Sequence, residues 1–372
     1  MPIFIMLLGA GAVFFVVRAV YRKYWNGGLS IDIRFDSEAG FEQDRGTLTE
    51  TIENRSFLPL PFLHAKFEVG AGIGFSSKEN VSTSDKNYKN DLFSILFFQR
   101  IVRTLPFVCL KRGYYPITAA SLISEDLFFT SHMVAEYPVN THFYVYPGQV
   151  DLRSLEDPLR KLMGDVKARS YLYPDPFEFR GIREYTVNDP FNTINWKASA
   201  RSQSLMVNEY GSTVSKEIDI LLNLEDEKLI SEPQLQEEAL RLAGTLIVRL
   251  LSQGYPVRLI TNGRDAETKE AATSLKANGP ADRERLLRAL SRLDLSLEPQ
   301  EFYPVLQQIG NDPDRIRIGC ILISSCMKEP LQEAFRKLSE DTAAFWVAPL
   351  YKLSDMHLAG IPAENSLFWE VK

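Results

Sequence analysis

Residues 179–210, FRGIREYTVNDPFNTINWKASARSQSLMVNEY, gather titratable and aromatic side chains in one short stretch, as active sites often do. Two of the carboxylates, Glu184 and Asp189, could serve as a general acid and a general base. The same stretch holds the basic residues Arg180, Arg183, Lys197 and Arg201. Nearby cations keep carboxylates ionised, whereas a general acid must hold a proton. The residue types therefore do not favour acid–base catalysis, and we expect no enzymatic activity.

Single-stranded nucleic acid is a second conceivable ligand, because basic and aromatic residues alternate here as they do in strand-binding grooves. Residues 178–216, however, contain five basic and four acidic residues, and a groove that follows a phosphate backbone needs a clear basic excess. The whole chain carries a net charge of −6. We therefore expect no nucleic-acid partner.

The chain lacks the common motifs of catalytic and redox sites. It contains no G-x-S-x-G, H-E-x-x-H or P-loop sequence. The four histidines, without metal-ligand spacing, are His64, His132, His142 and His357. The three cysteines, Cys109, Cys320 and Cys326, show no C-x-x-C spacing, which is typical of a reducing compartment. The last two lie an even number apart in an apolar run, so we predict buried, unreactive thiols on one face of a strand.

The elements that position these residues begin with an apolar helix. No charged residue occurs from Pro2 to Val17, and Arg18, Arg22 and Lys23 all lie on the C-terminal flank. With a snorkelling arginine, such a run approaches the ~20 residues that span a bilayer. The sequence therefore predicts a single-pass anchor to the cell membrane in the first 24 residues. The positive-inside rule predicts that the soluble domains are cytoplasmic.

Residues 25–150 have the pattern of an all-β, sandwich-like domain. Short alternating or apolar runs such as LSIDIRF, GTLTETIEN and LHAKFEV are separated by turn residues, without a ten-residue helical period among them. The run VGAGIGF is similar to a dinucleotide-binding loop, but it lacks the closing G-x-x-G and no helical pattern follows it. We expect strands, and no nucleotide site, in this domain.

Residues 216–372 show strands alternating with helices, which predicts an open α/β domain. The runs KEIDILLNLED, YPVRLIT, RIRIGCILISS and AFWVAP are apolar enough to be strands of a parallel sheet covered on both faces. The sequence SEPQ predicts a capping box with Ser231 as the N-cap of the first helix. Further helices are predicted at about 282–293 and at EPLQEAFRKLSED. Residues 151–215 are left as a linker that includes the polar segment.

The spacing of that polar segment resembles a known family, domain of unknown function 58. The residues that carry the resemblance are Arg183, Glu184, Tyr185, Asp189, Asn195, Trp196, Lys197 and Arg201. An apolar strand follows them within about twenty residues, and residues 111–129, KRGYYPITAASLISEDLFF, resemble the sandwich segment that precedes the domain in family members. The resemblance covers the whole chain. Members usually carry two N-terminal membrane helices, whereas this sequence predicts one.

The resemblance also implies a fold and a metal site. The family's α/β domain is similar to a von Willebrand factor A domain, a doubly wound parallel sheet that binds ligands beyond the carboxyl ends of its strands. There, Asp-x-Ser-x-Ser after the first strand holds a hard divalent cation. The matching positions here are Asn223, Glu225 and Glu227, and Ser325 stands where such domains often carry a later Asp.

Two interpretations of this altered site remain open. The longer carboxylates of Glu225 and Glu227 could recruit magnesium or calcium, and the alternative function is then a divalent-metal-dependent hydrolase that uses loop 223–227. Otherwise the acids belong to a solvated loop and a helix N-terminus, where they interact favourably with the helix dipole. We expect no physiological metal and no cofactor.

The polar segment allows two roles that are compatible with each other. Its ion pairs could tie an irregular segment to the α/β domain, with Trp196 buried in a pocket beneath it. The residues that would form these pairs are Arg183, Glu184, Asp189 and Arg201. Alternatively, the segment presents a surface to a partner. Members of the family commonly accompany a MoxR-type AAA ATPase and a transglutaminase-like membrane protein, so the resemblance implies a membrane-anchored protein-binding and assembly module.

Overall fold

The computed structural model describes residues 2–75, 81–83, 86–126, 130–172, 179–187, 189–210, 217–226, 232–271, 274–311, 319–351, 358 and 360–371. The chain forms two compact units, Met1–Gly148 and Gln149–Lys372.

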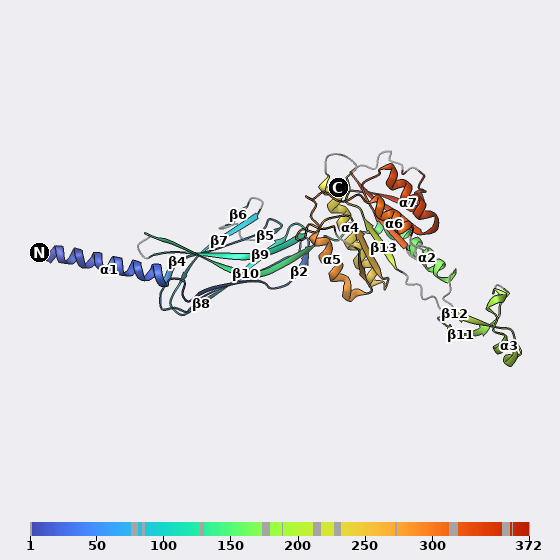
Figure 1. Ribbon diagram of the computed structural model, residues 1–372, viewed down its shortest axis with the longest axis horizontal. Helices are drawn as coiled ribbons and strands as arrows, with labels where there is room; N and C mark the ends of the chain where they lie inside the picture. The colour runs from blue at the N-terminus through green and yellow to red at the C-terminus, as the bar shows by residue number, and fades with distance from the viewer. Residues whose placement is uncertain are drawn as a thin grey trace. The chain divides into compact units, whose positions relative to one another are not determined.

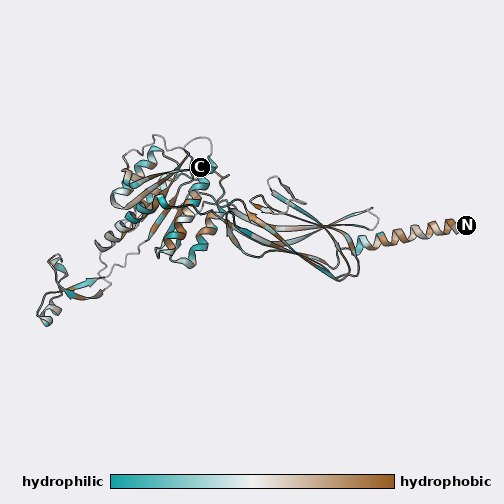
Figure 2. Cartoon of the chain, turned by 180° about the vertical axis from the view of Figure 1, so that it is seen from behind, coloured by the Kyte–Doolittle hydropathy of each residue, from teal (hydrophilic) through white to brown (hydrophobic). Residues whose placement is uncertain are grey.

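The first unit begins with the apolar helix α1 (Pro2–Tyr24), which Figure 2 colours brown over most of its length. Its span Ile3–Tyr24 is long and apolar enough to cross a membrane, as the sequence predicts. The end of the helix belongs to the core of the β-domain, because Tyr21 and Trp25 are buried there. The orientation of this helix in a membrane stays a prediction.

The β-domain of the first unit consists of two sheets (Figure 1), which confirms the predicted all-β character. One sheet has the strand order β1 (Leu29–Phe35), β3 (Arg45–Asn54), β8 (Gln99–Cys109) and β5 (Ile73–Phe75). The other has the order β2 (Ala39–Phe41), β10 (His132–Tyr146), β9 (Gly113–Glu125), β4 (Leu60–Gly70), β7 (Lys86–Ile95) and β6 (Val81–Thr83). Neighbouring strands are antiparallel, except that β2 pairs in parallel with β10.

Alternation along these strands builds the core between the two sheets. Leu48 and Ile52 of β3 are completely buried, and so is Phe107 of β8. The ring of Phe143 on β10 lies 5.2 Å from that of Phe107, edge to face. Each such aromatic ring removes a large apolar area from water, which is the main stabilising contribution in a domain of this kind.

The second unit is built on a six-stranded mixed sheet. Its order is β15 (Leu275–Ala277), β14 (Val257–Thr261), β13 (Ile218–Leu222), β16 (Gly319–Ile323), β17 (Ala343–Leu350) and β18 (Ser366–Glu370). All pairs are parallel except β14 with the edge strand β15. The parallel strands of the predicted α/β domain are therefore confirmed.

Helices cover this sheet, with α4 and α5 on one side and α6 and α7 on the other in Figure 1. The helices are α2 (Glu156–Leu172), α4 (Pro233–Ser252), α5 (Arg283–Arg292), α6 (Tyr303–Gly310) and α7 (Glu329–Asp341). Short 3₁₀ turns occur at Arg153–Leu155, Pro280–Asp282 and Ala363–Asn365. Leu322 of β16 and Trp346 of β17 belong to one core cluster with Phe335 of α7, and the rings of Trp346 and Phe335 are in contact.

Three local predictions need correction. Helix α4 takes Glu232, without a side-chain capping bond, as its N-cap, and Ser231 lies outside the described residues. Cys320 is buried on β16, but Cys326 is buried beyond the end of that strand, so the two do not share a strand face. The predicted linker contains helix α2, whose buried residues Leu159 and Leu162 give it an apolar side.

The polar segment forms a small two-stranded sheet, β11 (Phe179–Glu184) paired antiparallel with β12 (Met206–Tyr210). Between the strands lie a 3₁₀ turn at Phe191–Thr193 and the short helix α3 (Trp196–Ser202), which Figure 1 labels beside β11 and β12. Ile194 and Val207 are its buried apolar residues. This segment is therefore an element with its own local structure.

Candidate functional site

The carboxyl ends of the parallel strands form the first candidate site. Strands β13 and β16 are neighbours, and the chain leaves them in opposite directions, toward β15 on one side and β18 on the other. In an open α/β sheet, ligands bind beyond the carboxyl ends of the strands at such a reversal of strand order. Three polar residues follow the strands that meet here: Asn223 after β13, Asn262 after β14 and Ser324 after β16.

These three side chains are buried and joined by hydrogen bonds. Asn223 Nδ2 donates to Ser324 Oγ at 3.0 Å, and Asn262 Nδ2 donates to Asn223 Oδ1 at 2.9 Å. Asn262 Oδ1 accepts from the backbone NH of Leu224, and Ser324 Oγ accepts from the backbone NH of Cys326. The cluster ties together the loops that follow three strands.

The residues at this place do not fit a divalent cation. Asn223, Asn262 and Ser324 bring no formal charge, and their oxygens already accept hydrogen bonds from within the cluster. Hard cations in proteins take several oxygens, usually with carboxylates among them. Within the described residues, no group of three or more His, Cys, Asp or Glu side chains could hold a metal.

The remaining residues proposed for a metal site are Glu225, Glu227 and Ser325. Glu225 Oε2 accepts a hydrogen bond from the backbone NH of Phe302 at 2.9 Å, and its Oε1 lies 3.5 Å from Lys328 Nζ. Glu225 therefore joins the loop after β13 to the start of α6. Ser325 is half-buried next to Ser324, and no hydrogen bond brings it into the cluster. Glu227 lies outside the described residues.

The second candidate site is the polar segment, which is braced internally. The guanidinium of Arg183 donates to both oxygens of Asp189, at 2.7 and 2.6 Å. Asp189 also accepts from the backbone NH and the hydroxyl of Thr186, both at 2.8 Å. The Arg183 guanidinium thus holds the pKa of the Asp189 carboxyl well below its usual range. A carboxylate that stays ionised cannot act as a general acid near neutral pH.

Asn195 organises the other half of the segment. Its Oδ1 caps helix α3 by accepting from the backbone NH of Ala198 at 3.0 Å, and its Nδ2 donates to Asn208 Oδ1 on β12 at 2.7 Å. The ring of Tyr185 lies 5.9 Å from that of Phe191. The side chains of Arg183, Tyr185, Asp189 and Asn195 therefore shape the segment itself.

The prediction that Trp196 fills a buried pocket is wrong, because 69 % of its surface is exposed. Ile194, two residues before Trp196, is buried instead and forms a β-bridge with Val207 of β12. Glu184, Lys197 and Arg201 are exposed, and none of the three forms an ion pair with a described residue. The predicted ion pairs to the α/β domain are thus replaced by one pair, Arg183 with Asp189, inside the segment.

Several further apolar side chains of the segment are exposed. With Trp196 they form what we call the segment's apolar set: Phe179, Ile182, Val187, Phe191, Trp196 and Leu205. Such a concentration of exposed apolar side chains around a braced loop is typical of a protein interaction surface. The sequence pattern contains these residues, but their exposure follows from the fold of the hairpin.

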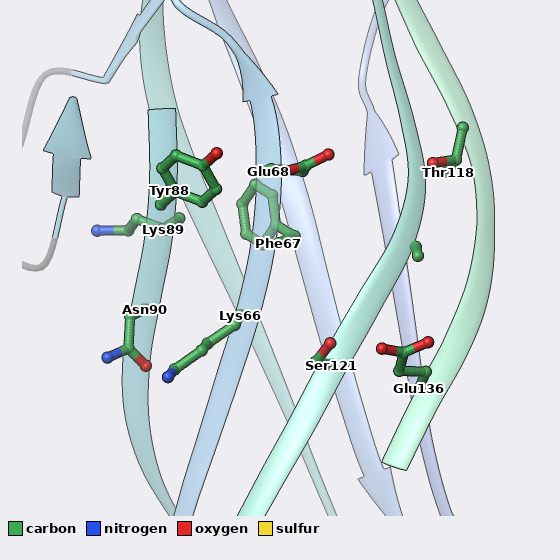
Figure 3. Close-up of a pocket in the computed structure, with 10 residues that line it drawn as sticks. Lys66, Phe67, Glu68, Tyr88, Lys89, Asn90, Thr118, Ser121 and Glu136 are labelled. Carbon is green, nitrogen blue, oxygen red and sulfur yellow. The ribbon is translucent and has the colours of Figure 1, made fainter. Parts of the chain in front are cut away.

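A groove of about 660 Å³ on the β-domain is a third candidate. It lies across β4, β7, β9 and β10, and Figure 3 shows Lys66, Glu68, Tyr88 and Glu136 among its lining side chains. The charges are of both signs, and no nucleophile is paired with a base among the lining residues.

Beneath the sheet surface, the β-domain buries three charged side chains, and a fourth, partly exposed one contacts them. Lys89 and Asp91 of β7 lie 3.3 Å apart, and Arg103 of β8 reaches Asp91 at 3.1 Å. Glu50 of β3 is buried beside them, and its oxygens accept no hydrogen bond from the described part of the chain. Burial, and then the charge of Asp91, raise the pKa of Glu50 to about 7. The four formal charges sum to zero.

The cysteines are chemically quiet. All three are buried, and burial raises the pKa of the Cys109 thiol to about 11 and that of Cys320 well above its ordinary value. Because the thiolate is the nucleophile, such thiols are unreactive at neutral pH. The predicted unreactive thiols are consistent with these environments.

Comparisons with known proteins add no functional assignment. No protein-family model and no curated protein matches the chain. Among solved structures, the CARDB domain of a Pyrococcus furiosus protein, in complex with di-metal ions, matches 30 % of this chain and 93 % of its own, with 14 % identity and a TM-score of 0.19. A non-cellulosomal cohesin from Archaeoglobus fulgidus matches 34 % and 96 %, with 13 % identity and a TM-score of 0.21. Likenesses this weak support no argument about fold or function.

Proposed function

We propose that the protein is a membrane-anchored binding and assembly module whose polar segment, residues 179–210, docks a partner protein. The observation that carries this proposal is the exposed Trp196 on an internally braced hairpin. Exposing a tryptophan to water is unfavourable, and rigid tryptophans are over-represented among the residues that dominate binding energy. The hairpin presents this side chain without needing to be ordered on binding, which favours affinity.

The chemistry of the surface suggests an acidic partner with an apolar pocket. Lys197 and Arg201 extend from the same helix as Trp196 and form no ion pair with a described residue. An apolar anchor flanked by two cations matches a pocket rimmed by carboxylates. By its resemblance to the domain of unknown function 58 family, we propose a MoxR-type AAA ATPase as the partner, with a transglutaminase-like membrane protein in the same assembly.

The second unit supports the proposal that its α/β domain is similar to a von Willebrand factor A domain. In chain order its strands are arranged 3-2-1-4-5-6, and the third strand, β15, is the antiparallel one. We propose that the neutral cluster of Asn223, Asn262 and Ser324 takes the place of that fold's metal site. Docking would then be independent of divalent cations. The basic residues Arg22 and Lys23 in the last turn of the helix favour a cytoplasmic position of both units.

Co-purification tests this function. A tagged full-length chain is extracted from membranes in mild detergent, and the MoxR-type ATPase retained with it is quantified. Trp196→Ala, and separately Lys197→Glu with Arg201→Glu, should lower the retained ATPase at least about tenfold, the effect of losing a central interface anchor. Tyr88→Ala, an exposed aromatic of the β-domain, is the matched control and should retain it fully.

Two results would contradict the proposal. One is retention of the ATPase by both segment variants at the level of the parent chain. The other is an association that requires magnesium or calcium and is lost in Glu225→Gln, which would favour a metal-dependent function of loop 223–227. Equal urea-unfolding midpoints of the parent and the variants would show that the fold is unchanged.

A further inference from the structure

Helix α1 enters the β-domain without a spacer. Val17 and Val20 pack against the core of the β-domain, Tyr21 and Trp25 are buried in it, and Tyr21 Oη donates a hydrogen bond of 2.8 Å to the carbonyl of Pro59. The candidate span Ile3–Tyr24 includes the first three of these residues. The end of the apolar span and the end of the β-domain are therefore one continuous structure, as the junction in Figure 1 shows.

Two loops of the β-domain lie at this junction. The loop before β4 holds Phe57, and the loop between β7 and β8 holds Leu96, Phe97 and Phe98. We call these four residues the tip cluster. They are exposed by 77, 52, 58 and 71 %, respectively, although all four are large and apolar. Unlike the core residues of the same domain, the tip cluster faces outward beside the helix.

Hydrogen bonds hold both loops in place. The backbone NH of Phe98 donates to the carbonyl of Ser56 at 3.1 Å. The buried amide of Asn54 donates to the carbonyls of Leu58 and Leu96, at 2.9 and 3.0 Å, and so links the two loops. Phe98 has a left-handed backbone with a φ of +51°, which is rare for an aromatic residue and persists only where the surroundings fix it. The exposure of the tip cluster is thus a built feature.

The dimensions of the helix place the tip cluster at a bilayer surface. A helix of 22 residues is about 33 Å long, close to the ~30 Å thickness of the hydrocarbon layer. When Ile3–Tyr24 spans the bilayer, its C-terminal end lies at the interface, and Pro59 is hydrogen-bonded to that end. Aromatic side chains concentrate at this depth in membrane proteins.

The charges around the tip cluster are also those of a membrane-facing surface. Arg22 and Lys23 are exposed on the last turn of α1, and Arg55 and Arg100 are exposed beside the two loops. One nearby acid, Glu53, is paired with Arg55 at 2.9 Å. Aromatic residues flanked by cations bind the interface of bilayers that contain anionic lipids.

We propose that the tip cluster inserts into the interfacial layer of the bilayer that α1 crosses, so that the β-domain stands directly on the lipid surface. This inference rests on the membrane anchoring in the proposed function and is independent of any partner of residues 179–210. The β-domain then has a fixed contact with the membrane as well as a tether, and lipid headgroups are its ligand at this end.

Site-directed spin labelling tests the inference on the full-length chain in vesicles of phosphatidylcholine and phosphatidylglycerol. The native cysteines are buried, so a nitroxide can be attached selectively to an introduced cysteine. Phe97→Cys labels the tip cluster. Leu110→Cys labels an exposed apolar residue at the opposite end of β8, about 35 Å away along the strand, and is the matched control. Val13→Cys labels the exposed middle of α1.

Collisions of each label with oxygen, which partitions into lipid, and with a nickel chelate, which stays in water, give its depth. We expect the label at residue 13 to lie deep in the bilayer and the label at residue 110 to be fully accessible to nickel. The label at residue 97 should lie at the interface, with an accessibility to nickel severalfold lower than that of the label at residue 110. If the label at residue 13 is deep but the labels at residues 97 and 110 are equally accessible to nickel, the inference is overturned. The membrane anchoring by α1 would still be supported.

Two other outcomes also decide the matter. Protection of the label at 97 from both nickel and oxygen would mean that protein covers the tip cluster, such as a second copy of this chain, and would overturn the lipid contact. A label at 13 that is accessible to nickel would refute the anchoring itself, and the inference with it.

Discussion

The side-chain amide of Asn223 and the hydroxyl of Ser324 form a 3.0 Å hydrogen bond across the ends of the adjacent parallel strands β13 and β16. This bond closes the place where open α/β sheets bind their ligands with a neutral, buried contact. Asn262 extends it to β14. The cluster therefore acts as a structural link between three strand ends.

Asn223→Asp should destabilise the protein although the two side chains have the same shape. The carboxylate cannot donate to Ser324 Oγ and places a charge at a residue that is 1 % exposed. We expect a loss of about 1–3 kcal/mol in the free energy of unfolding. Urea unfolding at pH 7 in detergent measures it, with exposed Asn192→Asp as the control. Added magnesium that stabilises the parent chain, in which residue 223 is Asn, would contradict the poor fit of the native residues to a cation.

Replacing Arg258 should lower the free energy of unfolding more than Asn223→Asp does. Its guanidinium makes a bidentate contact with Asp219, at 2.8 and 2.6 Å, and Asp219 is completely buried. Arg258→Met leaves a buried charge without its partner, and we expect a loss of about 3–5 kcal/mol in unfolding free energy. Asp219→Leu combined with Arg258→Met should recover most of it. If the single and the double variant unfold at the same urea concentration, the buried pair is not the cause.

Glu50 should make the β-domain less stable as the pH rises. Its pKa is about 7 in the folded chain and near the ordinary 4.5 in the unfolded chain. Below pH 4.5 Glu50 is protonated in both the folded and the unfolded chain, so its ionisation does not lower the stability there. Between pH 4.5 and 7 the unfolded state loses the proton first, and unfolding becomes easier by up to about 3 kcal/mol.

Calorimetry across that pH range checks this dependence. Glu50→Gln should remove it, because the amide does not titrate. Glu53→Gln, at a half-buried position on the same strand, should leave the dependence unchanged. A parent chain whose β-domain melts at the same temperature at pH 5 and pH 7 would argue against a raised pKa at Glu50.

Asp189→Asn should loosen the polar segment without unfolding the rest of the chain. The amide cannot accept both hydrogen bonds from Arg183 and also those from Thr186. We expect tryptic cleavage at the exposed Lys197 and Arg201 to become severalfold faster. Peptide mapping by mass spectrometry measures the rates. Glu184→Gln is the matched control on the same hairpin, and equal rates in both variants would exclude the bracing role of Asp189.

The strands and helices with a clear period could be predicted from the sequence. The mostly apolar IDILL and the run EPLQEAFRKLSED form β13 and α7, as predicted. Helix α2 was missed, although Leu155, Leu159, Leu162 and Val166 have the spacing of one helix face. Pro158 lies in the first turn of this helix, a position that tolerates proline.

The candidate site was harder to predict, because it depends on strand register. Leu222 pairs with Ile323, so the next residue of each strand, Asn223 and Ser324, become neighbours. Ser325, the residue singled out in the sequence, is the next one along the chain and is half-buried beside this cluster. Asn262 comes from a third strand, and no local pattern connects it to the other two. The exposure of Trp196 likewise depends on which neighbour the hairpin buries.

The burial of Tyr21 in the β-domain has a practical consequence for work on water-soluble forms of this protein. A chain shortened to begin at residue 25 would lose a residue that is 3 % exposed, together with its hydrogen bond to Pro59. The cut would open a hole in the core at the site of the removed helix turns, and the shortened domain would tend to aggregate. Preparations that keep the last three turns of α1, with exposed apolar positions such as Val16 replaced by polar residues, should remain folded.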